Sequence, residues 1–272
     1  MNQIKQLILS NSIDIATYSS YKNKLEIYLS SCQKKSKENT SNFLWRLVTL
    51  YNIKINFIKN FEYLKNGNFY ESWCILETIE ISLQNLINNS SKEFIDEYQV
   101  NFYKHYTQQW QSLFPYNIFF SMGFIASKFT CSICGHELRP RSLCNHRKGR
   151  IYDGELCFHI CNQMDDILEV SIVDNPMQKC CIPMIDYDYS LVKYAVDRLY
   201  SPFDGWFCHK TKMKVERSKF HSVLSEALCP CHEHNKRFGE CCFSKSQIEI
   251  PHVDFYFEKT FDESLPKFIF PY

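Results

Sequence analysis

The sequence predicts an α+β protein in which an N-terminal helical bundle precedes a cysteine-rich region of mixed helix and strand. Two observations favour this class. Apolar residues recur at helical spacing along the first half of the chain, whereas alternating segments and metal-ligand residue types mark the second half. Of fourteen cysteines, only Cys32 and Cys74 precede Cys131. The residues that can carry chemistry are therefore concentrated from Cys131 onward.

The whole segment before Cys131 is expected to be helical. Apolar spacing predicts helices over 12–31 and 43–65, and Asn66-Gly67-Asn68 predicts the end of the second one, because glycine readily adopts the left-handed conformation there. A further apolar stripe begins at Trp73 and predicts a third helix.

A capping motif predicts where the last helix of this bundle begins. Ser90-Ser91-Lys92-Glu93 has the pattern of a capping box, in which a serine hydroxyl and a glutamate satisfy free backbone N–H groups. Aromatic residues then recur on one face up to Leu113. We therefore expect one continuous helix over 94–113.

Short strands and helices are expected in the second half of the chain. Apolar and polar residues alternate over 155–161, 168–173 and 248–257, which predicts three strands. Apolar residues recur at helical spacing over 190–200 and 220–228, which predicts two short helices. Pro251 indicates an edge position for the last strand, because proline cannot donate to a β-ladder.

A tetrahedral metal site is predicted where cysteine and histidine first cluster. Cys131-Ser132-Ile133-Cys134 holds two thiols on one tight turn, and Cys144-Asn145-His146 supplies two more ligands. Thiolate and imidazole ligands in this pattern are typical of structural Zn²⁺. We therefore predict a closed zinc site, which favours scaffolding over catalysis. Its ligands would be Cys131, Cys134, Cys144 and His146.

A second cluster begins at Cys229-Pro230-Cys231 and ends at Cys241-Cys242, with Lys236-Arg237-Phe238 between them. These residues resemble the SEC-C motif, the zinc-binding tail of the preprotein translocase motor ATPase that recurs in many bacterial proteins. The resemblance covers residues 229–242 and implies a protein partner. It also implies a zinc ion held by Cys229, Cys231, Cys241 and Cys242. The Gly-Ser-Gly turn of the family is replaced by His232-Glu233-His234-Asn235, so His232 or His234 can compete as a ligand.

Further thiols allow a third metal site. If residues 155–161 form a strand, Cys157, His159 and Cys161 lie on the same face. Cys157 and Cys161 would head such a site; the alternative is that both are small core residues. The sequence therefore predicts two zinc ions and allows a third.

Two basic runs raise nucleic acid as an alternative partner, because arginine and lysine on metal-stiffened loops suit phosphate groups. The first run is Arg139, Arg141, Arg147, Lys148 and Arg150, and the second is Lys210, Lys212, Lys214, Arg217 and Lys219. The alternative for both is a solvated surface. The formal net charge of +1 implies no general attraction to nucleic acid.

Three functions are compatible with these features. The preferred one is a non-enzymatic adaptor or accessory subunit that presents its zinc modules to a protein partner. Residues 144–157 and 168–176 look similar to zinc-bearing segments of phage and prophage proteins, which favours a bacterial phage-defence system. The second is a nucleic-acid-binding protein. The third is a metal-dependent nuclease around Asp165, Asp166 and Glu169, although Glu169 lacks the lysine that such sites place after it.

The expected domains are a helical domain over 1–126, a zinc-knuckle α+β region over 127–215, and a SEC-C-like zinc module with a C-terminal strand over 216–272. No signal peptide is expected at the N-terminus, and no apolar run is long enough to cross a bilayer. Abundant thiols with metal-ligand spacing then predict a cytoplasmic protein without a membrane partner.

Overall fold

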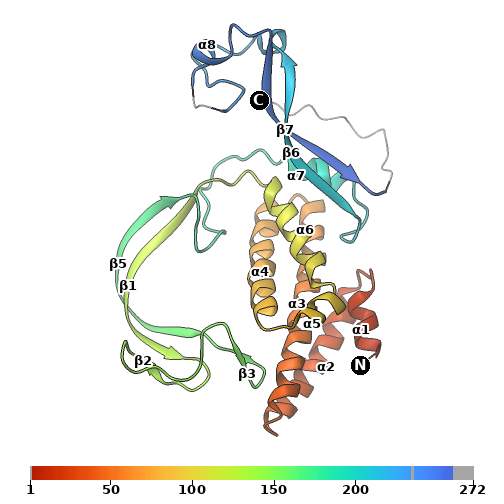
Figure 1. The fold of residues 1–272 in the computed structure, drawn as a ribbon, viewed down its shortest axis with the longest axis vertical. Coiled ribbons are helices and arrows are strands. Elements are labelled where there is room, and N and C mark those ends of the chain that lie inside the picture. The colour runs from red at the N-terminus through yellow and green to blue at the C-terminus, as the bar shows by residue number, and fades with distance from the viewer. Residues whose placement is uncertain (1, 234–235, 260–272) are drawn as a thin grey trace. The chain divides into compact units, whose positions relative to one another are not determined.

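The computed structural model describes residues 2–233 and 236–259 and combines helices with antiparallel strands (Figure 1). The chain divides into two compact units, Met1–Val196 and Asp197–Tyr272. The predicted α+β class with an N-terminal helical region is confirmed. The structure does not follow the expected boundary at 215/216, which would separate strand β6 (Trp206–Glu216) from its pairing partner β7 (Gln247–Phe257).

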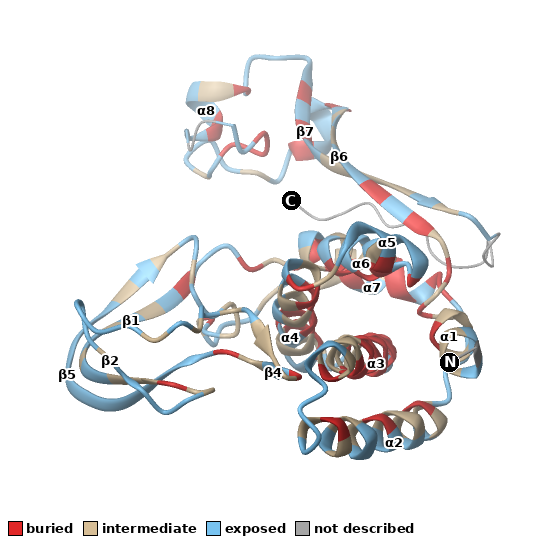
Figure 2. Cartoon of the chain, turned by 60° about the horizontal axis from the view of Figure 1, so that its bottom comes forward, coloured by how far each residue is buried: buried red, intermediate tan, exposed pale blue. Residues whose placement is uncertain are grey.

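The first unit begins with helices that pack around one central helix. They are α1 (Asn2–Leu9), α2 (Ile15–Gln33), α3 (Glu38–Lys65), α4 (Phe69–Asn88), α5 (Lys92–Glu97) and α6 (Val100–Leu113). α2 and α4 both pack on α3, and α6 packs on α4. Figure 2 shows α3 as a strongly buried helix between these neighbours. The core of the bundle therefore lies along α3.

Local capping chemistry decides where these helices end. Gly67 has a φ of +76° and follows α3, as predicted, and the Ser91 hydroxyl caps α5. The single helix expected over 94–113 is wrong. Gln99 adopts a left-handed φ of 53° and separates α5 from α6, so the aromatic stripe is divided between two helices.

A long two-stranded ribbon follows the bundle. β1 (Phe119–Cys131) and β5 (His159–Val173) pair antiparallel along their whole length (Figure 1). The short strands are β2 (Glu137–Leu138), β3 (Ile151–Tyr152) and β4 (Glu155–Leu156). β2 pairs with the outer edge of β1, and no other described strand pairs with β5.

This ribbon corrects the sequence-based expectations in two places. The segment before Cys131 is not all helical, because 119–131 is strand β1. Large residues alternate with small ones from Phe120 to Phe124, which suits a pleated strand. The two strands expected over 155–161 and 168–173 are instead the short β4 and one continuous β5. Cys157 lies between β4 and β5 and is buried.

Both ends of the ribbon are held by residues of α4 or directly after it. At one end, Trp73 stacks on Phe119 with ring centroids 6.3 Å apart. At the other end, Asn89 accepts a hydrogen bond from the Ile151 backbone N–H (3.1 Å) and donates one to the Gly149 carbonyl (2.8 Å). The loop beyond the ribbon therefore returns to the helical bundle.

A glycine allows the β3–β4 turn to lie directly on α2 and α3. The Gly154 N–H donates to the Asn42 side chain at 2.7 Å. Gly154 has a φ of +76°, and a Cβ there would lie 2.5 Å from a Leu29 methyl group and 3.0 Å from the Ser41 carbonyl oxygen. Both the backbone conformation and the close approach require glycine.

The second unit is a β6–β7 ribbon with a cysteine-rich loop between its strands. The expected strand over 248–257 is confirmed as part of β7, where Pro251 lies opposite Lys212. The helix expected over 220–228 is replaced by the 3₁₀ turn η1 (Arg217–Phe220) and further turns, followed by α8 (Phe238–Cys241). Helix α7 (Ser190–Asp197), shorter than the expected 190–200, precedes this unit.

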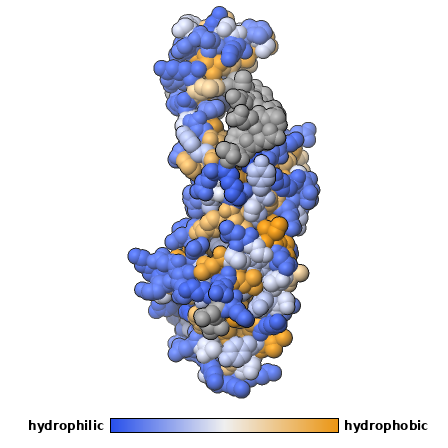
Figure 3. Space-filling view, turned by 90° about the vertical axis from the view of Figure 1, so that its right-hand side faces the viewer, coloured by the Kyte–Doolittle hydropathy of each residue, from blue (hydrophilic) through white to orange (hydrophobic). Residues whose placement is uncertain are grey.

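The surface is mixed in character. Figure 3 shows one face of the molecule, on which hydrophobic residues form patches among hydrophilic ones. Within the described ranges, no helix combines the length and the apolar character needed to span a bilayer.

The close contact at Gly154 yields a stability prediction. Gly154→Ala should lower the free energy of unfolding by roughly 3 kcal/mol, because it adds left-handed backbone strain to a clash with α2 and α3. Gly149→Ala is the matched control: its φ is +79°, but no atom lies within 4 Å of the place that the added methyl group would occupy. It should cost only about 1 kcal/mol. Urea unfolding of both variants measures the difference, and equal losses would contradict the contact.

Candidate metal centres

The first candidate centre forms where β1 ends in a tight turn. The Gly135 N–H donates to the Cys131 carbonyl at 2.8 Å, and the Cys131 N–H donates to the His136 carbonyl at 3.0 Å. These bonds fold Cys134 back beside Cys131. The four predicted ligand side chains place their ligand atoms within 4.8 Å of one another, and they are Cys131, Cys134, Cys144 and His146. The structure therefore brings together a group that can hold a metal ion.

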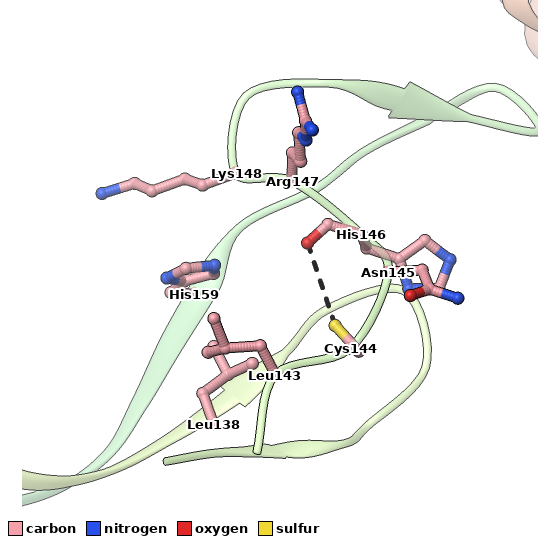
Figure 4. A pocket seen from close by; sticks show the side chains of 8 residues that line it. All are labelled: Leu138, Leu143, Cys144, Asn145, His146, Arg147, Lys148 and His159. Carbon is pink, nitrogen blue, oxygen red and sulfur yellow. Dashed lines mark hydrogen bonds between the residues drawn. The ribbon is translucent and has the colours of Figure 1, made fainter. Parts of the chain in front are cut away.

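Tyr152 organises the loop that carries the second pair of ligands. Its hydroxyl accepts a hydrogen bond from the Arg147 backbone N–H at 2.9 Å, and its ring lies edge-on to His146 with centroids 4.6 Å apart. The Cys144 thiol points toward the His146 carbonyl oxygen, 3.8 Å away (Figure 4). Cys144 and His146 are thus held on one compact turn.

Cys157 also lies at the first centre, which sequence reasoning did not foresee. Its sulfur is 3.8 Å from that of Cys131, and the residue is completely buried. Cys161 is exposed on β5, and its thiol donates to the Gln163 carbonyl at 3.4 Å. The structure therefore does not bring Cys157 and Cys161 together in the third site that the sequence allows. Two ligand groups are found among the described residues, the first centre and one other.

The electrostatics of the first centre favour a bound cation. Burial raises the pKa of the Cys131 thiol, but backbone N–H groups of its own turn and two neighbouring thiols outweigh this effect and lower the pKa to about 6. Burial and the nearby Cys131 sulfur raise the pKa of Cys157 to about 11. The lowered pKa favours the thiolate form at Cys131, and a cation would favour ionisation of the other thiols.

The second candidate centre lies in the core of the second unit. Its ligand atoms lie within 4.8 Å of one another and belong to Cys229, Cys231, Cys241 and Cys242. The Cys241 sulfur is 3.6 Å from that of Cys231 and 3.7 Å from that of Cys242. These separations suit thiolates that share one tetrahedral metal ion.

Phe238 explains why the two halves of this centre meet. It is 1% exposed, and its backbone N–H donates to the Ala227 carbonyl at 2.7 Å, which brings the start of α8 beside the first cysteine pair. The Cys242 N–H then donates to the Phe238 carbonyl at 3.2 Å. His232 is exposed and outside the ligand group, whereas His234 lies outside the described residues.

Sequence reasoning also missed a thiol contact on α4. The Cys180 thiol donates to the Glu77 carboxylate at 2.7 Å, and the backbone N–H groups of Lys179 (2.5 Å) and Cys180 (3.0 Å) donate to the same carboxylate. Burial, together with Cys74 and Glu77, raises the pKa of the Cys180 thiol. The signal in the sequence is the three-residue spacing of Cys74 and Glu77 on one helix face. The contact anchors the 178–182 loop to α4.

The carboxylates of the nuclease hypothesis do not converge. Asp165 accepts a hydrogen bond from the Gln163 amide at 2.6 Å, and Glu169 accepts one from the Ser171 hydroxyl at 3.1 Å. These two groups and Asp166 form no ligand group among the described residues. Nothing in the geometry favours catalysis there.

The first basic run is only partly available for a ligand. Arg139 pairs with Glu137 at 3.1 Å, and the Arg150 guanidinium donates to the Asn88 carbonyl. Arg147 and Lys148 are exposed, and no ion pair involves them within the described ranges. They line a hollow of about 460 Å³ beside the first centre (Figure 4). The hollow is lined by Leu138, Leu143, Cys144, Asn145, His146, Arg147, Lys148 and His159.

Two of the five residues of the second basic run lie beside acids. Alternation along β6 places Lys210, Lys212 and Lys214 on the same face. Lys212 forms an ion pair with Glu233, and Lys214 lies 3.7 Å from Glu249.

No protein-family model, curated protein or solved structure matches this chain. The likeness of residues 229–242 to the SEC-C motif therefore remains a prediction that rests on those residues alone.

Two independent ligand groups predict two separately removable metal ions. Elemental analysis of protein purified without chelator should find two metal ions per chain. Cys134→Ser and Cys229→Ser should each remove one of them, because each variant takes a thiolate from a different centre. Cys161→Ser is the matched control and should retain both. A single substitution that removed both metals, or neither, would contradict two independent centres.

Removal of the metal by a chelator should affect the loops of the first centre and the helical bundle of the first unit differently. A strong chelator should expose the loops around Cys131 and Cys157 to limited proteolysis, because metal coordination is expected to hold them together. The helical circular dichroism signal should largely remain, since the core around α3 contains no ligand of either centre. Cooperative loss of all helix on chelation would contradict this division.

Proposed function

We propose that this chain is a zinc-binding, non-enzymatic interaction protein that docks a protein partner on the β1–β5 ribbon. The observation that carries this proposal is an apolar ladder, three cross-strand pairs on one face of the ribbon. The pairs are Phe120 with Ile172, Met122 with Val170, and Phe124 with Ile167.

Directly opposite residues in antiparallel strands share a face, so the first two pairs form one surface in a single register. The pair of Phe124 with Ile167 follows a register shift between Gly123 and Phe124. The exposed fractions of its six residues range from 39% to 71%. The other face of the same stretch is polar or small, with Ser121 opposite Ser171 and Gly123 opposite Glu169. The ribbon is thus amphipathic, although none of the described elements covers its apolar face.

Such a surface is unfavourable in isolation. A two-stranded ribbon is marginally stable in water, and a contiguous exposed apolar patch marks an interaction site in many proteins. Six side chains of this size and exposure amount to roughly 600 Å² of apolar surface, which approaches the roughly 800 Å² that each partner contributes to a standard interface. A protein partner that covers the ladder would supply the missing second layer.

The two centres support zinc and a structural role. Their donors are thiolates with one imidazole, which are ligands preferred by zinc. Each group offers at least four protein ligands, which fills a tetrahedral ion and leaves no position for a reactive water. The separated carboxylates of Asp165, Asp166 and Glu169 also favour a non-enzymatic protein over a nuclease.

Site-specific photo-crosslinking in cells tests the proposed docking face. A photoreactive phenylalanine analogue at position 124 should crosslink to one identifiable polypeptide, and Met122→Thr with Val170→Thr should reduce that crosslink at least tenfold. Threonine keeps a high strand propensity but replaces apolar surface with a hydroxyl. The protein with the analogue at position 124 and the Met122→Thr, Val170→Thr double variant should each still bind two metal ions per chain.

The opposite face provides the matched control. The same analogue at position 121 should not crosslink to that polypeptide, and Ser121→Thr with Ser171→Thr should leave the crosslink at position 124 unchanged. Equal crosslinking from both faces, or a crosslink that survives the ladder substitutions, would contradict docking on the ladder. Crosslinking only to a second copy of this chain would identify the partner as the chain itself.

Nucleic-acid binding is the second candidate, and the hollow beside the first centre is the observation that favours it. Two cationic residues, Arg147 and Lys148, line this hollow, and none of its lining residues is acidic. Phosphate groups suit unpaired cations on a rigid loop. The ladder is the stronger observation, because much of the remaining basic surface is already paired with acids or carbonyl groups.

Charge reversal separates this candidate from protein docking. If nucleic acid binds here, Arg147→Glu with Lys148→Glu should abolish binding of a single-stranded oligonucleotide. In the wild type, these two residues should contribute about −1.4 to the slope of the logarithm of the association constant against the logarithm of the salt concentration. Lys34→Glu with Lys35→Glu changes the net charge equally on residues that do not line the hollow, and it should have little effect. Salt-independent or absent oligonucleotide binding by the wild type would reject this candidate.

A further inference from the structure

The first centre contains one donor more than a tetrahedral ion needs. Cys131, Cys134, Cys144 and His146 converge there, and Cys157 lies beside them. Structural zinc sites are almost always four-coordinate, so one of these five donors must stay outside the coordination shell.

One sulfur separation fits Cys157 as a ligand, although the group whose ligand atoms all lie within 4.8 Å of one another contains His146 and not Cys157. Two thiolates on one tetrahedral zinc ion, with bonds of about 2.3 Å, lie about 3.8 Å apart. The sulfurs of Cys131 and Cys157 are separated by 3.8 Å. Corresponding separations in the second centre are 3.6 Å for Cys231 and Cys241, and 3.7 Å for Cys241 and Cys242.

The backbone holds Cys157 in this position from two sides. Its N–H donates to the Arg150 carbonyl at 2.9 Å, and its carbonyl accepts from the Gly149 N–H at 2.8 Å. The next residue, Phe158, accepts from the Ser132 N–H at 3.0 Å and donates to the Ser132 hydroxyl at 2.8 Å. Cys157 is therefore tied both to the loop that follows His146 and to the turn between Cys131 and Cys134.

Burial and charge also favour four thiolates. Cys157 is completely buried, and the His146 ring packs edge-on against Tyr152. Four thiolates on a divalent ion leave a net charge of −2. Arg147 and Lys148 lie on the same loop and can balance that charge, which gives them a role that requires no nucleic acid.

We propose that Cys157 is the fourth ligand of the first centre, which is then a four-thiolate site, and that His146 supports it from outside the coordination shell. The buried Nδ1 of His146 has no hydrogen-bond partner among the residues that the structure describes. A neutral imidazole N–H at this place can donate to a metal-bound thiolate, as groups around metal ligands commonly do. This inference rests on the proposed binding of zinc at this centre but does not depend on partner docking.

Cobalt substitution of the full-length chain tests the ligand set. Cys229→Ser with Cys231→Ser first empties the second centre, so that one bound Co²⁺ reports on the first centre alone. The sulfur-to-cobalt charge-transfer absorption scales with the number of thiolates, and X-ray absorption on the zinc-loaded protein counts sulfur and nitrogen neighbours. We expect four sulfur neighbours and no nitrogen neighbour. Three sulfur atoms with one nitrogen atom would overturn the proposal.

Single substitutions in the same background identify the residue. His146→Ala should retain the charge-transfer intensity and the bound metal, with an affinity loss of about 10–100-fold, as expected for a supporting residue. Cys157→Ser should weaken metal binding by more than that, and the control Cys161→Ser should have no effect. Unchanged affinity and spectrum in Cys157→Ser, with loss of the metal in His146→Ala, would overturn the proposal.

Two further outcomes are also decisive. If Cys157→Ser does not fold, the neighbour count of the parent protein and the His146→Ala spectrum still distinguish the two ligand sets. If the parent protein binds no metal at the first centre, both this inference and the zinc part of the proposed function fail. Four sulfur neighbours together with a failed crosslinking experiment would leave this inference standing and reject only the docking face.

Discussion

Convergence of thiols at Cys131 is the constraint on which the β region of the first unit depends. The ribbon of β1 and β5 has no second layer among the described residues, so packing alone cannot hold it. Cys131 is the last residue of β1, and the loops that carry Cys144 and Cys157 cross back over it. A metal ion bound there would join the end of the ribbon to both loops, in place of the hydrophobic core that this region lacks.

The helical bundle supplies the second fixed point. Trp73 holds the start of β1, and Asn89 holds the loop after the first centre, so the two ends of α4 act on opposite ends of the ribbon. The close approach at Gly154 adds a third contact, to α2 and α3. The ribbon is thus fastened at both ends and free along its length, which leaves the apolar ladder accessible to a partner.

The charges around the first centre have two competing explanations. Arg147 and Lys148 can bind phosphate groups, or they can balance the negative charge of a four-thiolate site. The second explanation needs only residues of this chain. It agrees with the contacts of the neighbouring arginines, because Arg139 pairs with the Glu137 carboxylate and Arg150 donates to the Asn88 carbonyl. It is also consistent with a formal net charge of only +1.

The sequence by itself determined the class of fold and the two cysteine-rich groups that can hold a metal ion. Helical periodicity identified the bundle around α3, and the spacing of Cys131 with Cys134 and of Cys229 with Cys231 identified the centres, because both signals lie within a few consecutive residues. Only the tertiary structure decided which partners meet across long separations. It placed Cys157 beside Cys131, paired β1 with β5, and left the ladder exposed, since these contacts depend on how distant segments pack rather than on local pattern.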